Sequence, residues 1–313
     1  MKLAVIIPVY NSAATLPAAL ASIAAQTRRP DEIWLVDDAS PDPATQAYLR
    51  SLGGVYQGIL LKVVFQSKNQ GAGAARNRAL AATRCELVAF LDADDAWLPA
   101  HLAQSVAALA ADPSLGFVAS NFWAVAPNGT QVLQDCAAIS RRTDWLNRHG
   151  NPRLQYFYRG FIGILTVVAR RDCLQRGGGF RADARYSLDW ECWHAALAAN
   201  PGMGFAVLPE PAALYTLSPG GLTSKTWPRL AERESYLPSF VKNVAHAGGV
   251  PWPVLLLRGW LTIQYETLGP LLQRRAFGKV LQLGLRAPLA LARLYGAVLR
   301  GVPPRRDYLT EGH

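Results

Sequence analysis

The stretch Leu87-Val88-Ala89-Phe90-Leu91-Asp92-Ala93-Asp94-Asp95 decides the fold, because an apolar run ends abruptly in three carboxylates. Five consecutive apolar residues with no polar alternation are typical of a strand buried on both faces of a sheet. The acidic residues follow at the carboxyl end of that strand, where open α/β sheets bind their ligands. An Asp-x-Asp turn alone is more often a solvated loop or a helix cap, so the neighbouring segments carry the interpretation.

The same pattern extends on both sides of this stretch. Further short apolar runs indicate strands at residues 3–9, 33–36, 59–65 and 115–120. The segments between them predict helices at residues 13–26, 43–51, 72–82 and 98–111, the first capped by Asn11 or Ser12. Strands that alternate with helices predict an α/β fold with a mostly parallel sheet.

Polar residues follow two more of the predicted strands. Asn11 comes after the first strand, and Asp37 and Asp38 come after the second. Together with the Asp92–Asp95 turn they predict one acidic pocket at a single sheet edge, and such a pocket needs a divalent cation to hold a phosphorylated ligand. Hard oxygen ligands suit Mg²⁺ or Mn²⁺. A simple turn at Asp37-Asp38, or a receiver domain of the response-regulator kind, is the competing interpretation.

After about Asn121 the rhythm changes. Pro127-Asn128-Gly129 predicts a hairpin within residues 122–133, a strand is expected at 163–169, and a helix at 188–199 follows the loop at Gly177-Gly178-Gly179. Beyond Pro219 the composition shifts to helical segments rich in Leu and Arg. We therefore expect a boundary near residue 220, with a basic helical extension over residues 221–313.

Four motifs now stand in order along the chain: Pro8-Val9-Tyr10-Asn11, Val36-Asp37-Asp38-Ala39-Ser40, Asn69-Gln70-Gly71 with Ala75-Arg76-Asn77, and Leu91-Asp92-Ala93-Asp94-Asp95. In this order they resemble the signature of family 2 glycosyltransferases, and the likeness covers residues 1–220. The resemblance implies a GT-A fold, a Rossmann-like mixed sheet flanked by helices. It also implies inverting transfer from a UDP-, GDP- or dTDP-sugar, with donor binding at about residues 1–120 and the acceptor side at about 121–220.

The resemblance further implies roles for individual residues. Asp38 would bind the nucleobase, Asp92 the ribose, and Asp94 the Mg²⁺ or Mn²⁺ ion on the diphosphate. Other donor contacts are expected from Pro8, Tyr10, Asn11, Asn69, Arg76 and Asn77. Loop packing and a helix cap explain Tyr10 and Asn11 equally well, and Arg76 could pair with the acidic cluster.

The segment Leu188-Asp189-Trp190-Glu191 follows Gly178-Gly179-Phe180 and resembles the part of the family that bears the catalytic base. The usual Glu-Asp pair appears here as Leu188-Asp189, so Asp189 is expected to be the general base. Glu191 is the alternative, because two residues apart on a helix the two carboxylates face different ways. A capping or ion-paired carboxylate is the structural interpretation. The run Tyr215–Ser218 departs from the family by lacking a basic residue and a His, a role for which Lys225 is the substitute considered.

The expected task is the addition of one sugar to a glycan or a lipid-linked intermediate during polysaccharide or glycolipid assembly. A sugar-phosphate nucleotidyltransferase is the enzyme rival, but its glycine-rich, Arg-containing loop is missing where Pro8–Asn11 stands. A degenerate transferase that only binds nucleotide-sugars as a scaffold is the non-enzyme rival, and the retained Asp92, Asp94 and Asp189 argue against it.

The positive charge of the chain is concentrated near its end. Residues 251–313 contain nine Lys or Arg and three Asp or Glu, so they carry six of the ten net positive charges. Lys279, Arg286, Arg293 and Arg300 recur every seventh residue, although Pro288 is expected to break or kink that helix. The pattern fits either an anionic membrane surface or helices that pack on the catalytic domain with their arginines in water. No recognised nucleic-acid motif accompanies the charge.

Composition bounds the remaining alternatives. Half the residues are hydrophobic and 17% are charged, which is typical of a folded protein. The four cysteines are scattered without metal-site or disulfide spacing, so a reducing cytosol is expected. Pro8 and Pro17 interrupt the uncharged N-terminal stretch, which therefore indicates a strand, a loop and a helix rather than a signal peptide. We expect a cytoplasmic protein, soluble or peripheral on the cytoplasmic face of the membrane.

Overall fold

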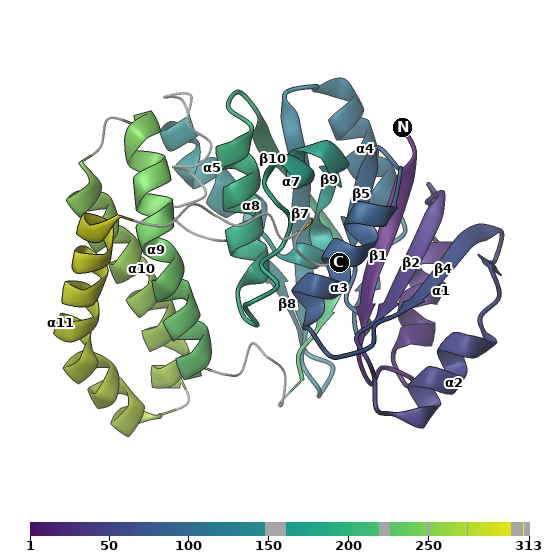
Figure 1. Cartoon of the computed structure of the whole chain (residues 1–313), viewed down its shortest axis with the longest axis horizontal. Helices are drawn as coiled ribbons and strands as arrows, with labels where there is room; N and C mark the ends of the chain where they lie inside the picture. The colour runs from purple at the N-terminus through teal and green to yellow at the C-terminus, as the bar shows by residue number, and fades with distance from the viewer. Residues whose placement is uncertain (148–160, 219–225, 249–250, 274, 302–308, 310–313) are drawn as a thin grey trace. The chain divides into compact units, whose positions relative to one another are not determined.

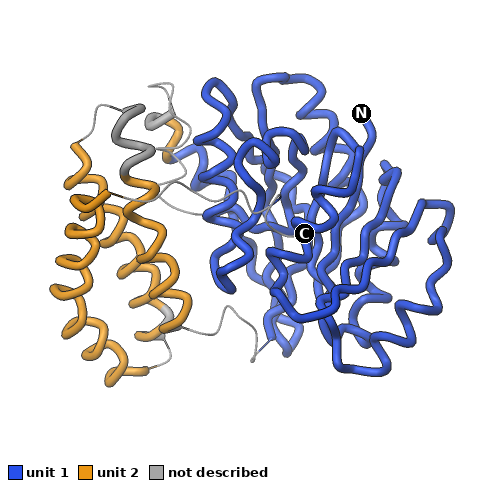
Figure 2. The backbone as a smooth tube through the Cα atoms, viewed as in Figure 1, with its two compact units in different colours: residues 1–142, 161–219, 306–313 blue, residues 143–160, 220–305 orange. Residues whose placement is uncertain are grey.

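The computed structural model describes residues 1–147, 161–218, 226–248, 251–273, 275–301 and 309 (Figure 1). The chain forms two compact units (Figure 2). The first comprises residues 1–142, 161–219 and 306–313, and the second comprises residues 143–160 and 220–305. The functional division into residues 1–220 and 221–313 stays a prediction.

The first unit is built on one mixed sheet. Its parallel part contains β1 (Leu3–Val9), β2 (Glu32–Asp37), β4 (Ile59–Phe65) and β5 (Leu87–Phe90). The other strands are β3 (Val55–Tyr56), β6 (Ala96–Trp97), β7 (Leu115–Val125), β8 (Gln131–Gln134), β9 (Val168–Arg170) and β10 (Gly204–Thr216). The strand order is β3-β4-β2-β1-β5-β9-β7-β10-β6, with β8 paired to β7. Antiparallel β9 between β5 and β7 makes the sheet mixed, so the predicted α/β fold class is confirmed.

Helices cover both faces of this sheet. They are α1 (Leu16–Ala24), α2 (Pro43–Ser51), α3 (Ala72–Ala82), α4 (His101–Ala111), α5 (Cys136–Asn147), α7 (Arg171–Arg176) and α8 (Leu188–Ala199), with a 3₁₀ turn at Ile164–Thr166. Because side chains alternate along a strand, Val5 and Ala89 pack with α1 and α4 on one face. Phe90 points to the other face, where its ring lies 6.0 Å from that of Trp193 in α8.

Four predicted element boundaries were wrong. Helix α1 begins at Leu16 behind Thr15, with Pro17 in its first turn, the only helical turn that tolerates proline well. Asn11 instead takes a left-handed backbone (φ 52°) in the preceding loop. Likewise α4 begins at His101, after Pro99, instead of at residue 98. Residues 164–166 form a 3₁₀ turn, so that the expected strand shortens to β9.

The predicted hairpin is confirmed. Strands β7 and β8 pair in antiparallel fashion on either side of a tight turn. The amide of Gly129 donates to the carbonyl of Ala126 at 2.8 Å, and its φ of 82° is one that glycine adopts without strain. The turn chemistry that predicted the hairpin is therefore the chemistry that forms it.

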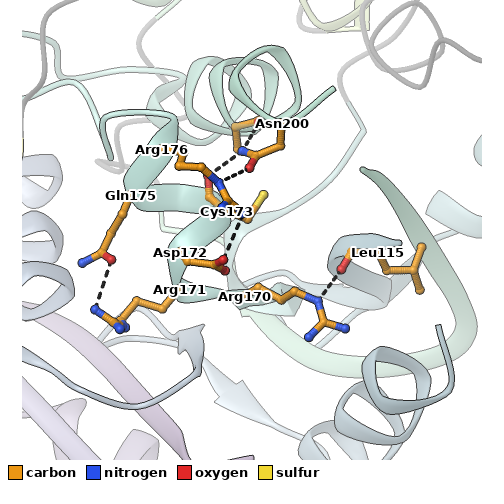
Figure 3. A network of polar contacts seen from close by, with 9 residues as sticks. Leu115, Arg170, Arg171, Asp172, Cys173, Gln175, Arg176 and Asn200 are labelled. Carbon is orange, nitrogen blue, oxygen red and sulfur yellow. Dashed lines mark hydrogen bonds and ion pairs between the residues drawn. The ribbon is translucent and has the colours of Figure 1, made fainter. Parts of the chain in front are cut away.

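A polar network fixes α7 and the end of α8 (Figure 3). Arg170 donates from Nε to the carbonyl of Leu115 in β7 at 2.8 Å. Arg176 binds both Asp172, at 2.9 Å, and the side-chain oxygen of Asn200. Asn200 in turn donates to the carbonyl of Cys173 at 2.9 Å. The network holds the carboxyl end of α8 to the sheet, so the first turn of α8 starts from a fixed position.

The second unit is helical. It contains α9 (Thr226–Gly248), α10 (Trp252–Gln273) and α11 (Phe277–Arg300), which contact one another in pairs. Helix α11 continues through Pro288, so the predicted break is absent. Among the described residues, no helix is long and apolar enough to cross a membrane.

We predict that Gly73→Ala destabilises the first unit. A Cβ at Gly73, inside α3, would lie 2.5 Å from the backbone oxygen of Arg181, so one of the two segments must shift. The free energy of unfolding should fall by roughly 1–3 kcal/mol, measured by urea denaturation. Gly284→Ala is the matched control, because this helical glycine has nothing within 4 Å of its Cβ position. Equal stability of Gly73→Ala and wild type would contradict the packing described.

Candidate active site

Three loops meet at one edge of the sheet. Strands β1, β2 and β5 are parallel neighbours, with Val9 level with Asp37 and Ile6 level with Phe90. The amide of Asp38 donates to the carbonyl of Val9 at 2.9 Å, and the amide of Leu91 donates to that of Ile6 at 3.2 Å. The loops that carry Asn11, Asp38 and Asp92 therefore leave the sheet side by side.

The loop after β1 is tied to the loop after β2. Ser40 Oγ accepts from the amide of Asn11 at 3.0 Å and donates to Asp37 at 2.5 Å. Asn11 Oδ1 accepts from the amide of Asp42 at 3.2 Å. In the structure Asn11 and Asp37 thus shape the loops themselves. Pro8 is half-buried near the end of β1, while Tyr10 is 48% exposed at the edge.

Asp38 organises a third loop, the one between β4 and α3. Its carboxylate is buried and accepts from Gln66 Nε2 and from the amides of Gln70 and Gly71, each at 2.7 Å. Asn69 lies exposed on this loop. The nucleobase contact of Asp38 stays a prediction, since the described contacts are all with the chain itself.

Arg76 connects α3 to the acidic turn. Its Nη2 lies 2.5 Å from Asp92 Oδ1, and its guanidinium lies over the ring of Phe180, 5.6 Å from the centroid. The arginine is 5% exposed, and its Nε has no hydrogen-bond partner among the described residues. The ion pair with the acidic cluster, one of the two readings from sequence, is present. The Asp92 side chain keeps 32% exposure, so it remains accessible to a ligand.

Asn77, next along α3, holds the loop that leads to α8. Its Nδ2 donates to the carbonyl of Phe180 at 2.7 Å, and its Oδ1 accepts from the amide of the same residue at 2.8 Å. Both atoms of this buried amide therefore bind the Gly178–Phe180 segment. Its predicted contact with the donor stays a prediction.

The acidic turn concentrates negative charge. Desolvation, followed by the nearby charge of Asp92, raises the pKa of Asp94 above its ordinary value. The same two causes raise the pKa of Asp95 to about 9. Asp95 is 3% exposed; its Oδ1 accepts from the amide of Thr216 at 2.8 Å, and its Oδ2 has no partner among the described residues. The sequence assigned Asp95 no role, and the structure shows it clamping the end of β10.

This donor set fits a divalent cation. All three side chains of the turn offer hard oxygen atoms, and the raised pKa values show that excess negative charge there is unfavourable without a cation. Across the part of the chain that the structure describes, no three His, Cys, Asp or Glu side chains converge into a complete metal cage. The residues thus fit an ion held by one or two carboxylates and by oxygen atoms of its ligand.

Helix α8 carries the two candidate bases. Asp189 and Glu191 both lie in its first turn; Asp189 is half-buried, whereas Glu191 is 6% exposed. The fully buried Trp193 fixes the helix, with its ring 5.8 Å from Phe180 and 5.4 Å from Phe117. Because Phe180 also lies under Arg76, α8 and the acidic turn share one aromatic cluster. Lys225 lies outside the described residues.

The comparisons identify the family. The family model "Glycosyl transferase family 2" matches residues 4–170, more than half of the chain. The chain therefore belongs to glycosyltransferase family 2 and is a glycosyltransferase. The first curated relatives are matched over 32–56% of their own length.

Three similar proteins show how far the likeness reaches. WfgD of Escherichia coli, a UDP-Glc:α-D-GlcNAc-diphosphoundecaprenol β-1,3-glucosyltransferase, is 25% identical over 76% of this chain and 86% of its own. TarS of S. aureus with UDP-GlcNAc has a TM-score of 0.63 at 23% identity, covering 85% of this chain and 73% of that one. PcManGT of Pyrobaculum calidifontis, a mannosyltransferase with GDP-Man and Mn²⁺, has a TM-score of 0.52 at 20% identity, covering 95% and 87%. These structures share the GT-A fold, as the sequence predicted.

We predict that Asp95→Asn removes a loss of stability at alkaline pH. A carboxyl whose pKa is higher in the folded than in the unfolded state stabilises the fold at low pH, and that contribution is lost as pH rises toward about 9. The wild type should lose up to about 1.4 kcal/mol of unfolding free energy per pH unit over this range. The variant, which keeps an acceptor for Thr216, should be flatter in urea denaturation between pH 5 and pH 9. Parallel pH profiles would contradict a protonated Asp95.

Proposed function

We propose that this chain is an inverting glycosyltransferase that moves a sugar from a nucleoside diphosphate-sugar to an acceptor hydroxyl, with Asp189 as the general base. The observation that carries the proposal is the joint placement of the acidic turn and α8. Asp92 pairs with Arg76, Arg76 lies over Phe180, and Phe180 packs on Trp193 of α8. One connected cluster thus supports both the donor-binding and the proton-accepting residues.

The donor would lie along the edge formed by the ends of β1, β2 and β5. Asp38 and the loop it holds are proposed to receive the nucleobase, and the half-exposed Asp92 to receive the ribose. Arg76 adds positive charge beside the diphosphate. Pro8, Tyr10, Asn11, Asn69 and Asn77 complete the proposed donor side. Nucleotide-sugar complexes of TarS and PcManGT support a nucleotide-sugar donor.

Asp94 is proposed to hold Mg²⁺ or Mn²⁺. When bound, the ion would supply Lewis-acid stabilisation of the departing nucleoside diphosphate. The exposed carboxylate of Asp94 suits this role better than Asp95, whose side chain is buried against the end of β10. The Mn²⁺ in the PcManGT complex supports a metal in this fold.

The chain's own residues perform the proton transfer. As the acceptor oxygen attacks the anomeric carbon, its proton passes to the Asp189 carboxylate, and the bond to the nucleoside diphosphate breaks on the opposite face. Asp189 is favoured over Glu191 because a base must reach the acceptor, and Glu191 is buried. Trp193 is fully buried and serves packing rather than sugar stacking.

The acceptor is proposed to be a glycan or a lipid-linked saccharide in polysaccharide or glycolipid assembly. The support is the acceptor in the name of WfgD, a diphosphoundecaprenol-linked sugar. We propose a cytoplasmic location, which the four free cysteines support, because all of them are buried as thiols.

We predict that donor binding depends on a divalent cation and on Asp94. UDP-, GDP- and dTDP-sugars, each with and without Mg²⁺ or Mn²⁺, should raise the melting temperature of the purified protein for one donor class only in the presence of metal. Asp94→Asn should remove this metal-dependent shift, while the shift from nucleotide alone persists, because Asp92 and Asp38 remain. A donor that binds equally well in chelator, or no donor binding at all, would contradict the proposal.

We predict that Asp189→Asn separates binding from transfer. The amide cannot accept the proton, so release of nucleoside diphosphate in the presence of acceptor should fall by roughly 10²–10⁴-fold, with donor binding unchanged. Asp172→Asn, an exposed carboxylate on α7 in an ion pair with Arg176, is the control and should keep full activity. Full activity of Asp189→Asn would move the role to Glu191 or to another group.

A further inference from the structure

The helical unit is held together from within by a polar cluster on α9. Glu234, 6% exposed, accepts from Trp260 Nε1 at 3.3 Å and from Gln264 Nε2 at 2.8 Å, both on α10. It also pairs with Arg286 of α11 at 2.8 Å. Arg286, one of the four basic residues at seven-residue spacing, is therefore used inside the unit.

The outer faces of the other two helices are apolar. On α11, Leu283 and Leu294 are buried, and the opposite side of the helix exposes Leu281 (66%), Leu285 (75%) and Leu299 (66%). Phe277, Leu289 and Tyr295 extend this surface. On α10, the exposed large apolar residues fall at helical spacing: Val254, Leu257, Leu261, Tyr265 and Leu272. Contiguous apolar surface of this kind on a folded protein indicates an interaction site.

The charge beside these faces is almost entirely positive. Between residues 251 and 301 the sequence has seven Lys or Arg and one acidic residue, Glu266. Glu266 is already paired with Arg233 at 2.6 Å. Lys279, Arg293 and Arg300 are exposed and follow one flank of α11, roughly a quarter turn from Leu285. A basic flank beside an apolar face matches a surface with apolar depth and negative charge.

We propose that the outer faces of α10 and α11 dock on an anionic lipid bilayer, with Leu281, Leu285 and Leu299 entering the headgroup region and Lys279, Arg293 and Arg300 contacting lipid phosphates. A second copy of the chain fits less well, because it would place two basic flanks together without compensating carboxylates. The inference goes beyond the proposed function and is tested without donor or acceptor, so its failure and that of the proposed activity are distinguishable.

The test is flotation of the full chain with vesicles of phosphatidylcholine alone or with about one-third phosphatidylglycerol. We expect binding to the anionic vesicles, weakened strongly between about 0.05 M and about 0.5 M salt, because salt screens the charges. Leu281→Glu with Leu285→Glu should reduce binding at least about tenfold, because charged side chains are excluded from the apolar layer. Arg293→Gln with Arg300→Gln should reduce it about 10–30-fold, from about 1 kcal/mol per charge at the surface.

Matched control variants change equally exposed residues of the first unit. Val55→Glu with Val132→Glu controls for loss of apolar surface, and Arg50→Gln with Arg84→Gln controls for loss of charge. All four should retain the circular dichroism spectrum of the wild type, and the controls should retain vesicle binding.

Two results would overturn the proposal. The first is absence of flotation, or flotation that the controls reduce as much as the α11 variants do. The second is a dimer in light scattering that dissociates in Leu281→Glu with Leu285→Glu, which would assign the face to a second copy.

Discussion

The ion pair between Arg76 and Asp92 is the interaction on which the site depends. It joins α3 to the acidic turn after β5, and it places a buried guanidinium over Phe180. Burying a cation is unfavourable unless a carboxylate and further contacts offset the loss of hydration. Asp92 and the ring of Phe180 provide those contacts, while Asn77 fixes the Phe180 backbone from the same helix. The position of α8, and with it Asp189, follows from this arrangement.

The acidic turn divides its work by depth. Asp92 is half-exposed and balanced by Arg76, Asp94 is exposed, and Asp95 is buried against Thr216. Because three carboxylates cannot all be charged so close together without a counterion, the deepest one has the most strongly raised pKa. The outer two are left for ligand and cation. A single tripeptide thus combines a structural acid with two binding carboxylates.

The helical unit reverses the usual distribution of polarity. Its charged cluster of Glu234, Arg286, Arg233 and Glu266 lies at the helix contacts, while the outer sides of α10 and α11 are apolar. Breaking a buried pair by removing one partner is costly, so these contacts specify how the helices meet. The outer apolar sides contribute nothing to that packing, which is why their function is sought outside the chain.

The sequence by itself determined the parallel strands, the β7–β8 hairpin and the family, because these depend on local apolar runs, turn chemistry and short motifs. It misplaced the start of α1, since both Asn11 and Thr15 can precede a helix and only the packed loop distinguishes them. It also could not assign the partners of Asp38, Asn77 and Asp95, which bind groups 32, 103 and 121 residues away along the chain. Only the tertiary structure decided those contacts, because hydrogen bonds and desolvation depend on distance in space, which residue order alone does not fix.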